Sequence, residues 1–186
     1  MIYREVAKPD YTLEDHWFER IDEVIAQGGW DLVVMQQGPS SLPKSRENLR
    51  HWTANFDSLI KAAGARSALF QVWPASRYYK SFTAVRESYR AAALDVNGMF
   101  IPAGEAWRTA WYASPKLDLY GPDGLHPSRL GTYVVALVHF ELIYNRPATD
   151  LPDVAIVNGR KLKTPPATVA LLQEAAHATV MTWGIR

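Results

Sequence analysis

The chain has 186 residues, of which 48% are hydrophobic and 21% charged, a composition typical of a globular domain and not of a disordered segment. Twenty basic and 19 acidic residues leave a net charge of +1, so neither a nucleic acid nor a membrane surface is indicated as a partner. The lack of cysteine excludes disulfides and thiol chemistry. No apolar run approaches the roughly 18–20 residues of a membrane span. We expect one domain over residues 1–186, and the absence of cysteine and of a visible signal peptide favours the cytoplasm while the compartment stays open.

The N-terminal third predicts a strand, a helix and a second strand. Ile2–Val6 is a short strand pattern, and Thr12 is a typical helix N-cap with acidic residues following it. Apolar residues at helical spacing then predict one helix that ends at Gly28-Gly29. Asp31–Gln36 is a nearly continuous apolar run, as in parallel strands buried on both faces.

The rest of the chain continues the alternation of helices and strands. The spacing of apolar residues and the positions of Gly and Pro predict helices over Ser45–Ala63, Thr83–Val96, Glu105–Ala113, Ser128–Tyr144 and Pro166–Trp183, strands over Ala68–Trp73 and Met99–Pro102, and an edge strand or extended arm over Val154–Val157. This order predicts an α/β fold in which helices cover both faces of a parallel sheet. Ligands of such sheets bind at the carboxyl ends of the strands.

One turn carries the strongest chemical signal. Asp123 and His126 lie three residues apart in the Gly- and Pro-rich segment 120–127, directly before the helix predicted from Ser128. A carboxylate can hold an imidazole in one tautomer and stabilise it when it takes a proton from a hydroxyl. The bland alternative is a turn in which the Asp caps its own backbone and the His lies in solvent.

Three segments together give the chain its resemblance to the SGNH/GDSL hydrolases. Residues 123–133 resemble the last block of that family, which supplies the catalytic Asp and His. Residues 31–41 resemble the block that ends in the oxyanion-binding loop, and residues 102–107 resemble the stretch after the fifth strand. The resemblance implies a three-layer α/β/α domain with a flavodoxin-like sheet, a serine esterase activity without a cofactor, and His126 as the base oriented by Asp123.

The family's nucleophilic serine motif has no counterpart in this sequence. Ile2–Val6 resembles the family's second strand, so the first strand, its serine and the crossover helix are expected to lie upstream of Met1. In the family's sheet the first strand lies between the second and the third, and three alternatives follow for this vacated slot. Ile2–Val6 pairs directly with Asp31–Gln36, another chain fills the slot, or the sequence begins too far downstream and lacks the strand. A relative that has lost its catalysis is the competing interpretation.

The oxyanion loop also departs from the family pattern. Gln37 and the Gly38 N–H are candidate oxyanion donors, and Ser41 stands where carbohydrate acetylesterase relatives have Asn. Ser40 or Ser41 is a candidate substitute nucleophile, although neither lies in a Gly-x-Ser-x-Gly elbow, and a role in capping a turn is the alternative.

Further residues have both a functional and a packing interpretation. His16 faces either the cleft or the core, Glu105 either caps a helix or contacts the catalytic loop, and Trp73 with the segment 77–79 lines a pocket or only packs. No group of residues has the spacing of metal ligands. The sequence therefore predicts a hydrolase of small-molecule or carbohydrate acyl esters. Because these 186 residues contain no clear nucleophile, their own esterase activity is expected to be absent or weak. A non-catalytic binding or scaffold protein is the first alternative, and a homo-oligomer paired through exposed strand edges is the second.

Overall fold

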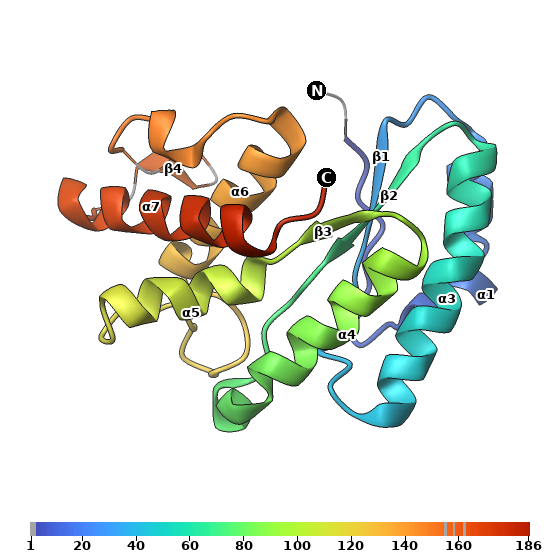
Figure 1. Cartoon of the computed structure of the whole chain (residues 1–186), viewed down its shortest axis with the longest axis horizontal. Coiled ribbons are helices and arrows are strands. Elements are labelled where there is room, and N and C mark those ends of the chain that lie inside the picture. The colour runs from blue at the N-terminus through green and yellow to red at the C-terminus, as the bar shows by residue number, and fades with distance from the viewer. Residues whose placement is uncertain (1–2, 155, 158, 162) are drawn as a thin grey trace.

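A parallel sheet forms the centre of the computed structural model, which describes residues 3–154, 156–157, 159–161 and 163–186. Its strands are β1 (Leu32–Met35), β2 (Arg66–Phe70) and β3 (Met99–Ile101), in the order β1-β2-β3 (Figure 1). Both pairings are parallel, with Val34 opposite Ala68 and Ala68 opposite Met99. The parallel sheet expected from the alternating pattern is confirmed.

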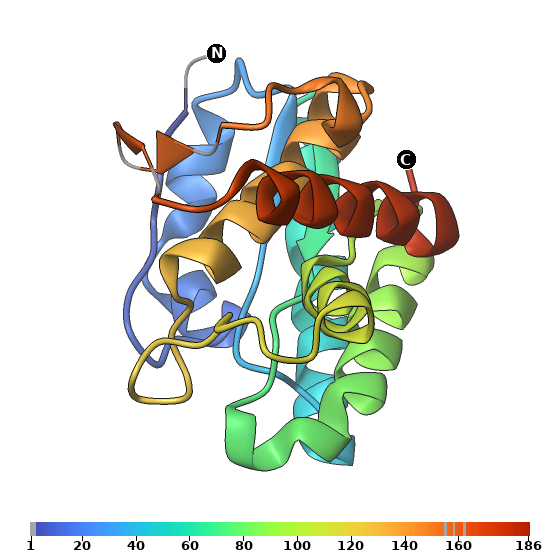
Figure 2. The same cartoon turned by 90° about the vertical axis from the view of Figure 1, so that its left-hand side faces the viewer.

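Helices cover the two faces of this sheet, as Figures 1 and 2 show. One face carries α3 (Pro43–Ala62) and α4 (Phe82–Asp95), and the other carries α5 (Ala103–Ala113), α6 (Arg129–Tyr144) and α7 (Pro166–Trp183). Successive strand residues point to opposite faces. Leu69 and Phe100 therefore join the core under α3 and α4, whereas Ala68, Met99 and Ile101 join the core under α5, α6 and α7. These layers confirm the predicted α/β/α architecture.

The ends of the long helices agree closely with their sequence signals. Pro43 and Pro166 each stand in the first turn of a helix, where the missing N–H of proline costs nothing. Ser128 caps α6, and its side chain accepts a hydrogen bond from the Gly131 N–H at 3.1 Å. The predicted turn before that helix is thus anchored at its C-terminal end. Two short 3₁₀ helices, η1 (Ser76–Ser81) and η2 (Ala148–Asp150), lie in the connections.

The N-terminal region differs from the sequence expectation. Residues 3–6 form no strand and are exposed, so the strand expected over Ile2–Val6 is wrong there, and Ile2 lies outside the described residues. The single helix expected to end at Gly28-Gly29 is instead two helices, α1 (Leu13–Phe18) and α2 (Ile21–Ala26). Arg20 separates them because its backbone is left-handed, with φ at 65°.

The segment 154–157, expected to be an edge strand or an extended arm, does not join the central sheet. β4 (Ile156–Val157) pairs antiparallel with β5 (Arg160–Lys161) in a separate two-stranded hairpin, and Ala155 lies outside the described residues. The outer edge of β3 is used by the C-terminal segment instead. Ile185 pairs with Phe100 there, and the Phe100 N–H donates to the Ile185 carbonyl at 3.0 Å.

The outer edge of β1 has no partner strand among the described residues. Val34 in this strand is 41% exposed, although its neighbour Met35 is buried. Pairing of this edge with Tyr3–Val6, one of the alternatives for the vacated slot, does not occur. Within the described ranges, no helix is both long and apolar enough to cross a membrane.

Candidate active site

Asp123 and His126 form a hydrogen-bonded pair in the loop that connects α5 to α6. The Asp123 Oδ2 lies 2.5 Å from the His126 Nδ1. The other carboxylate oxygen, Oδ1, accepts hydrogen bonds from the backbone N–H groups of Leu125 and His126, both at 3.0 Å. Asp123 thus closes its own turn with one oxygen and orients the imidazole with the other. The His126 side chain is 77% exposed, so its ring is accessible from solvent.

Contacts from the segment after β2 fix the position of this loop. The Trp73 indole N–H donates to the Leu125 carbonyl at 2.9 Å, and the Tyr120 hydroxyl donates to the Pro74 carbonyl at 2.6 Å. The Ser76 N–H donates to the Gly124 carbonyl at 2.8 Å. Gly124 has a φ of +67°, and a Cβ there would lie 2.5 Å from the Ser76 hydroxyl, so the turn requires glycine.

The charge of Asp123 is stabilised by these hydrogen bonds. The hydrogen bond with His126 is the largest cause, followed by the two backbone N–H groups, and together they lower the pKa of Asp123 to about 2. The carboxylate therefore stays ionised across the neutral and mildly acidic range. An ionised carboxylate at Nδ1 leaves Nε2 as the ring nitrogen that can accept a proton from a substrate or nucleophile.

Gln37 and its neighbours form a second polar group, which is buried at the end of β1. The Gln37 Oε1 accepts from the Leu13 N–H at 3.0 Å, and its Nε2 donates to the Ser40 hydroxyl at 2.9 Å. Both ends of this amide are occupied, so the Gln37 side chain serves the loop and is not presented as an oxyanion donor. The Gly38 N–H, in contrast, donates to no acceptor in the described part of the chain and is exposed.

Tyr89 of α4 anchors the same loop through hydrogen bonds to its backbone. Its hydroxyl donates to the Gln37 carbonyl at 2.5 Å and accepts from the Gln37 N–H at 3.0 Å. The ring is fully buried, and this burial raises the pKa of Tyr89 far above its usual range. The hydroxyl therefore remains protonated and fixes the backbone of Gln37 and Gly38.

The polar group around Gln37 and the Asp123–His126 pair are separate in the described structure. The loop 36–41 and the turn 120–127 both lie at the end of the molecule toward which β1 and β2 run (Figure 1). No hydrogen bond connects the two groups within the described ranges. Ser41 is half-buried and lines an open groove of about 590 Å³ beside Arg46, Arg50 and Asp95. It makes no described contact with His126.

Ser40 has a structural part in its loop. Its backbone is left-handed, with φ at 54°, and its buried hydroxyl donates to the Gly38 carbonyl at 3.0 Å while accepting from Gln37. These contacts match the turn-capping interpretation. The substitute-nucleophile interpretation finds no support in the geometry of Ser40.

Most of the remaining candidates have packing contacts in the described structure, whereas Tyr79 of the segment 77–79 lines an open groove beside α5. His16 lies against the ring of Tyr11, and partial burial lowers the pKa of its imidazole. Trp73 stacks on the buried Trp107, with ring centroids 4.1 Å apart. Glu105 lies in the first turn of α5, which has no side-chain cap hydrogen bond, and its buried carboxylate contacts Arg86 and Arg108. No group of side chains in the described ranges could hold a metal ion.

Several residues that shape the site carried no recognisable signal. Tyr89 and Tyr120 bind loop backbones that lie 52 and 46 residues away in the sequence. The sequence indicated a pocket only through the end of the predicted strand at Pro74 and the aromatic segment beside it. That pattern singled out Trp73 but not its hydrogen bond to Leu125. Such long-range contacts depend on the topology and not on local spacing.

Two solved structures resemble this fold. A DUF4886 family protein from Bacteroides uniformis ATCC 8492 superposes with a TM-score of 0.70 and 23% identity, over 87% of this chain and 66% of its own length. A protein from Slackia heliotrinireducens, provisionally named an SGNH hydrolase, superposes with a TM-score of 0.57 and 25% identity, over 69% of this chain and 73% of its own. No family model and no curated protein sequence matches the chain.

These likenesses establish the class of fold. The chain has an SGNH-like α/β/α fold with a parallel three-stranded sheet. It spans slightly less than two thirds of the length of the Bacteroides protein.

Proposed function

We propose that the chain carries the base and the oriented carboxylate of an SGNH-type acyl-ester hydrolase. The observation that carries the proposal is the 2.5 Å contact between Asp123 Oδ2 and His126 Nδ1, with Asp123 Oδ1 held by two backbone N–H groups. The similarity to a protein provisionally named an SGNH hydrolase supports the same class.

The proposed reaction uses His126 twice. Its Nε2 takes the proton of a serine hydroxyl while the serine oxygen attacks the acyl carbonyl, and Asp123 stabilises the imidazolium that forms. The imidazolium then protonates the departing alcohol, leaving an acyl-enzyme. A water molecule, deprotonated by His126, then attacks the ester carbonyl; the bond to the serine oxygen breaks, His126 returns the proton to that oxygen, and the acid is released. The unengaged Gly38 N–H is the proposed donor to the oxyanion, since preorganised backbone donors stabilise that charge.

We propose that the nucleophilic serine comes from a strand and turn outside these 186 residues. Two observations support this: no hydroxyl contacts His126 in the described part of the chain, and the outer edge of β1 lacks a partner there. A strand paired with β1 would satisfy that edge.

Esters of carbohydrate hydroxyl groups are the proposed substrates. The sequence basis is the likeness of residues 36–41 to the oxyanion loop of carbohydrate acetylesterases, with Ser41 in place of their Asn. This likeness concerns one loop, so the acyl group and the alcohol must be determined by assay.

Hydrolysis of p-nitrophenyl acetate tests the proposal. The assay compares the 186-residue chain with a chain extended by the residues that its gene encodes upstream of Met1. We expect activity in the extended chain, loss of roughly 10²–10⁴-fold in its His126→Ala variant, and little or none in the shorter chain. His51→Ala is the matched control, because His51 is exposed on α3 and bonded to Asn55. An extended chain whose hydrolysis survives His126→Ala overturns the proposal.

A non-catalytic binding protein on the same fold is the second candidate. The 77% exposure of the His126 side chain and the absence of a hydroxyl beside it in the described part of the chain are compatible with this candidate too. On this account, His126→Ala leaves the function of the native protein unchanged.

A further inference from the structure

An open groove of about 860 Å³ lies between η1, α4, α5 and the loop after α5. Its volume falls in the range of about 300–1,000 Å³ that is usual for small-molecule sites. The residues that line it come from distant parts of the sequence and include Ser76, Tyr79, Arg86, Glu105, Arg108, Trp111, Tyr112, Tyr120 and Trp183.

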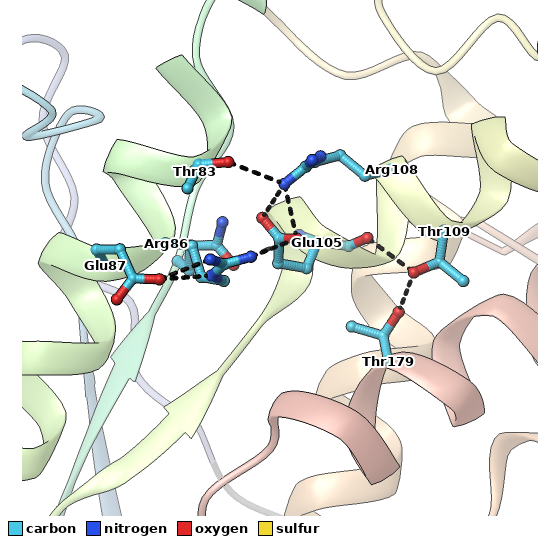
Figure 3. Close-up of polar contacts among 8 residues, drawn as sticks. Thr83, Arg86, Glu87, Glu105, Arg108, Thr109 and Thr179 are labelled. Atoms are coloured by element: carbon cyan, nitrogen blue, oxygen red, sulfur yellow. Dashed lines mark hydrogen bonds and ion pairs between the residues drawn. The ribbon is translucent and has the colours of Figure 1, made fainter. Parts of the chain in front are cut away.

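The polar part of the groove is built around a buried carboxylate, shown in Figure 3. Glu105 is 5% exposed, and its carboxylate contacts the Arg108 Nη1 at 3.1 Å and the Arg86 Nη1 at 3.5 Å. Arg86 is itself fixed, since it also bonds the Glu87 carboxylate at 2.6 Å and stacks 4.1 Å from the Trp183 ring. Removing such a carboxylate from water is costly, and the two guanidinium groups offset that cost.

Arg108 has donors to spare in this arrangement. Within the described ranges its hydrogen bonds all use Nη1, with Thr83 and Glu105 as acceptors. The side chain lines the groove and is 34% exposed, and its Nε and Nη2 have no acceptor among the described residues. A guanidinium presents its donors in a rigid plane that suits two neighbouring oxygen acceptors.

Aromatic rings form the other wall. Trp111 and Tyr120 stack with centroids 5.6 Å apart, and Tyr79 meets Trp111 at 5.9 Å. Tyr112 is 93% exposed and has no ring partner among the described residues. Exposed aromatic faces beside fixed polar groups suit a ligand with an apolar face and a polar rim.

We propose that this groove binds a pyranose ring of a carbohydrate. The C–H face of a pyranose packs on aromatic rings, and its neighbouring hydroxyls can pair with the Arg108 donors, which the buried Glu105 carboxylate holds in place. A simple anion suits the site less well, because Glu105 and Glu87 balance the charges of Arg86 and Arg108. The faces of the aromatic rings carry partial negative charge and therefore do not attract an anion.

The groove adjoins the turn that carries His126. Ser76 lines the groove and donates its N–H to the Gly124 carbonyl, and Tyr120 lines it and pairs with Pro127. A sugar held here would lie beside the turn that carries the imidazole. Its role as the substrate of hydrolysis rests on the proposed function, whereas sugar binding itself does not.

Isothermal titration calorimetry of the 186-residue chain tests the site. The probes are xylohexaose, cellohexaose and chitohexaose, with inorganic phosphate as the anion control. We expect at least one saccharide to bind and Tyr112→Ala to raise its Kd by roughly 2- to 10-fold, the value of one aromatic contact. Arg108→Lys should also weaken binding, because it keeps the charge and loses the planar fork. Tyr78→Ala is the matched control: Tyr78 is exposed on η1 but does not line the groove, so its loss should leave Kd unchanged.

Three results would overturn the inference: no saccharide binding at millimolar concentration, binding of phosphate alone, or equal effects of Tyr78→Ala and Tyr112→Ala. Circular dichroism of each variant establishes that it folds. His126→Ala separates the two proposals, because it should abolish hydrolysis in the extended chain and leave saccharide binding intact. Binding without hydrolysis defeats only the hydrolase proposal, and hydrolysis without binding defeats only this inference.

Discussion

At the scale of single residues, Asp123 combines two roles that the sequence presented as alternatives. One oxygen caps the turn through the N–H groups of Leu125 and His126, as an ordinary turn aspartate does. The other oxygen accepts the His126 Nδ1 contact at 2.5 Å. The bland and the functional interpretations therefore describe the same geometry, and the backbone hydrogen bonds make the imidazole orientation more rigid.

The titration of Asp123 is the first prediction at this scale. Its pKa should be measured near 2 by carbon-detected NMR of the carboxyl group, against about 3.9 for an ordinary Asp. His126→Ala removes the largest cause of the shift, so the pKa should rise toward the ordinary value in that variant. A pKa that is unaffected by His126→Ala would show that the contact is not formed in solution.

The same shift fixes the sign of the pH dependence. Because the folded-state pKa lies below the unfolded value, the stabilising effect of Asp123 on its turn is present above about pH 4 and disappears as the pH falls through about 2. The turn should therefore remain ordered at pH 4. Loss of the His126 resonance pattern at that pH would contradict this expectation.

Tyr89 gives the second prediction. Tyr89→Phe leaves the buried Gln37 N–H and carbonyl without their partner and should lower the free energy of unfolding by about 1–3 kcal/mol. Urea unfolding measures the change. Tyr3→Phe, at an exposed position, is the control and should match the parent chain. Equal stability of the two variants would mean that the loop 37–41 does not depend on Tyr89.

At the scale of elements, the long helices and the strands of the central sheet were predictable because their signals are local, but β1 is an edge strand with Val34 exposed and not, as expected, a strand buried on both faces. Apolar spacing, the cap at Ser128 and the proline at Pro166 are all readable within a few residues, whereas the helix expected from Ser45 begins at Pro43. The break at Arg20 was not predictable, since an arginine with a left-handed backbone carries no pattern of its own. Residues 3–6 look like a strand, but a strand needs a partner that their sequence does not specify.

The packing of α6 supplies the prediction at this scale. A Cβ on Gly131 would collide with the Leu119 carbonyl and lie 2.6 Å from the Trp107 ring. Gly131→Ala should therefore destabilise the chain by about 1–3 kcal/mol, although alanine favours an isolated helix by about 1 kcal/mol. Thermal unfolding provides the measurement, with the exposed Arg129→Ala as the control. A stabilised Gly131→Ala chain would contradict the close approach of α6 to Leu119.

At the scale of the whole molecule, the site is assembled by topology. The Asp–His turn was visible in the sequence because its two residues are three apart. The groove beside it was visible only in part: the segment 77–79 was a candidate pocket lining and contributes Tyr79, but Ser76, Arg108 and Trp183 meet only after the chain has folded. Gln37 lies after β1, as expected, but the sequence did not show that its amide is already hydrogen-bonded to Leu13 and Ser40.

The free edge of β1 predicts the behaviour of the chain in solution. Unpaired backbone groups on an exposed strand favour pairing with a second copy. The 186-residue chain should therefore self-associate more than the N-terminally extended chain, as measured by light scattering over a dilution series. A clean monomer for the shorter chain at every concentration would argue against an open edge.

Covalent labelling with a fluorophosphonate, followed by peptide mass spectrometry, tests the central claim most directly. The reagent phosphonylates a serine hydroxyl that an oriented imidazole has activated. The account predicts label on one serine of the upstream segment in the extended chain, and loss of that label in the Asp123→Asn and His126→Ala variants. Label that persists in both variants, or an extended chain that takes no label at all, would contradict it.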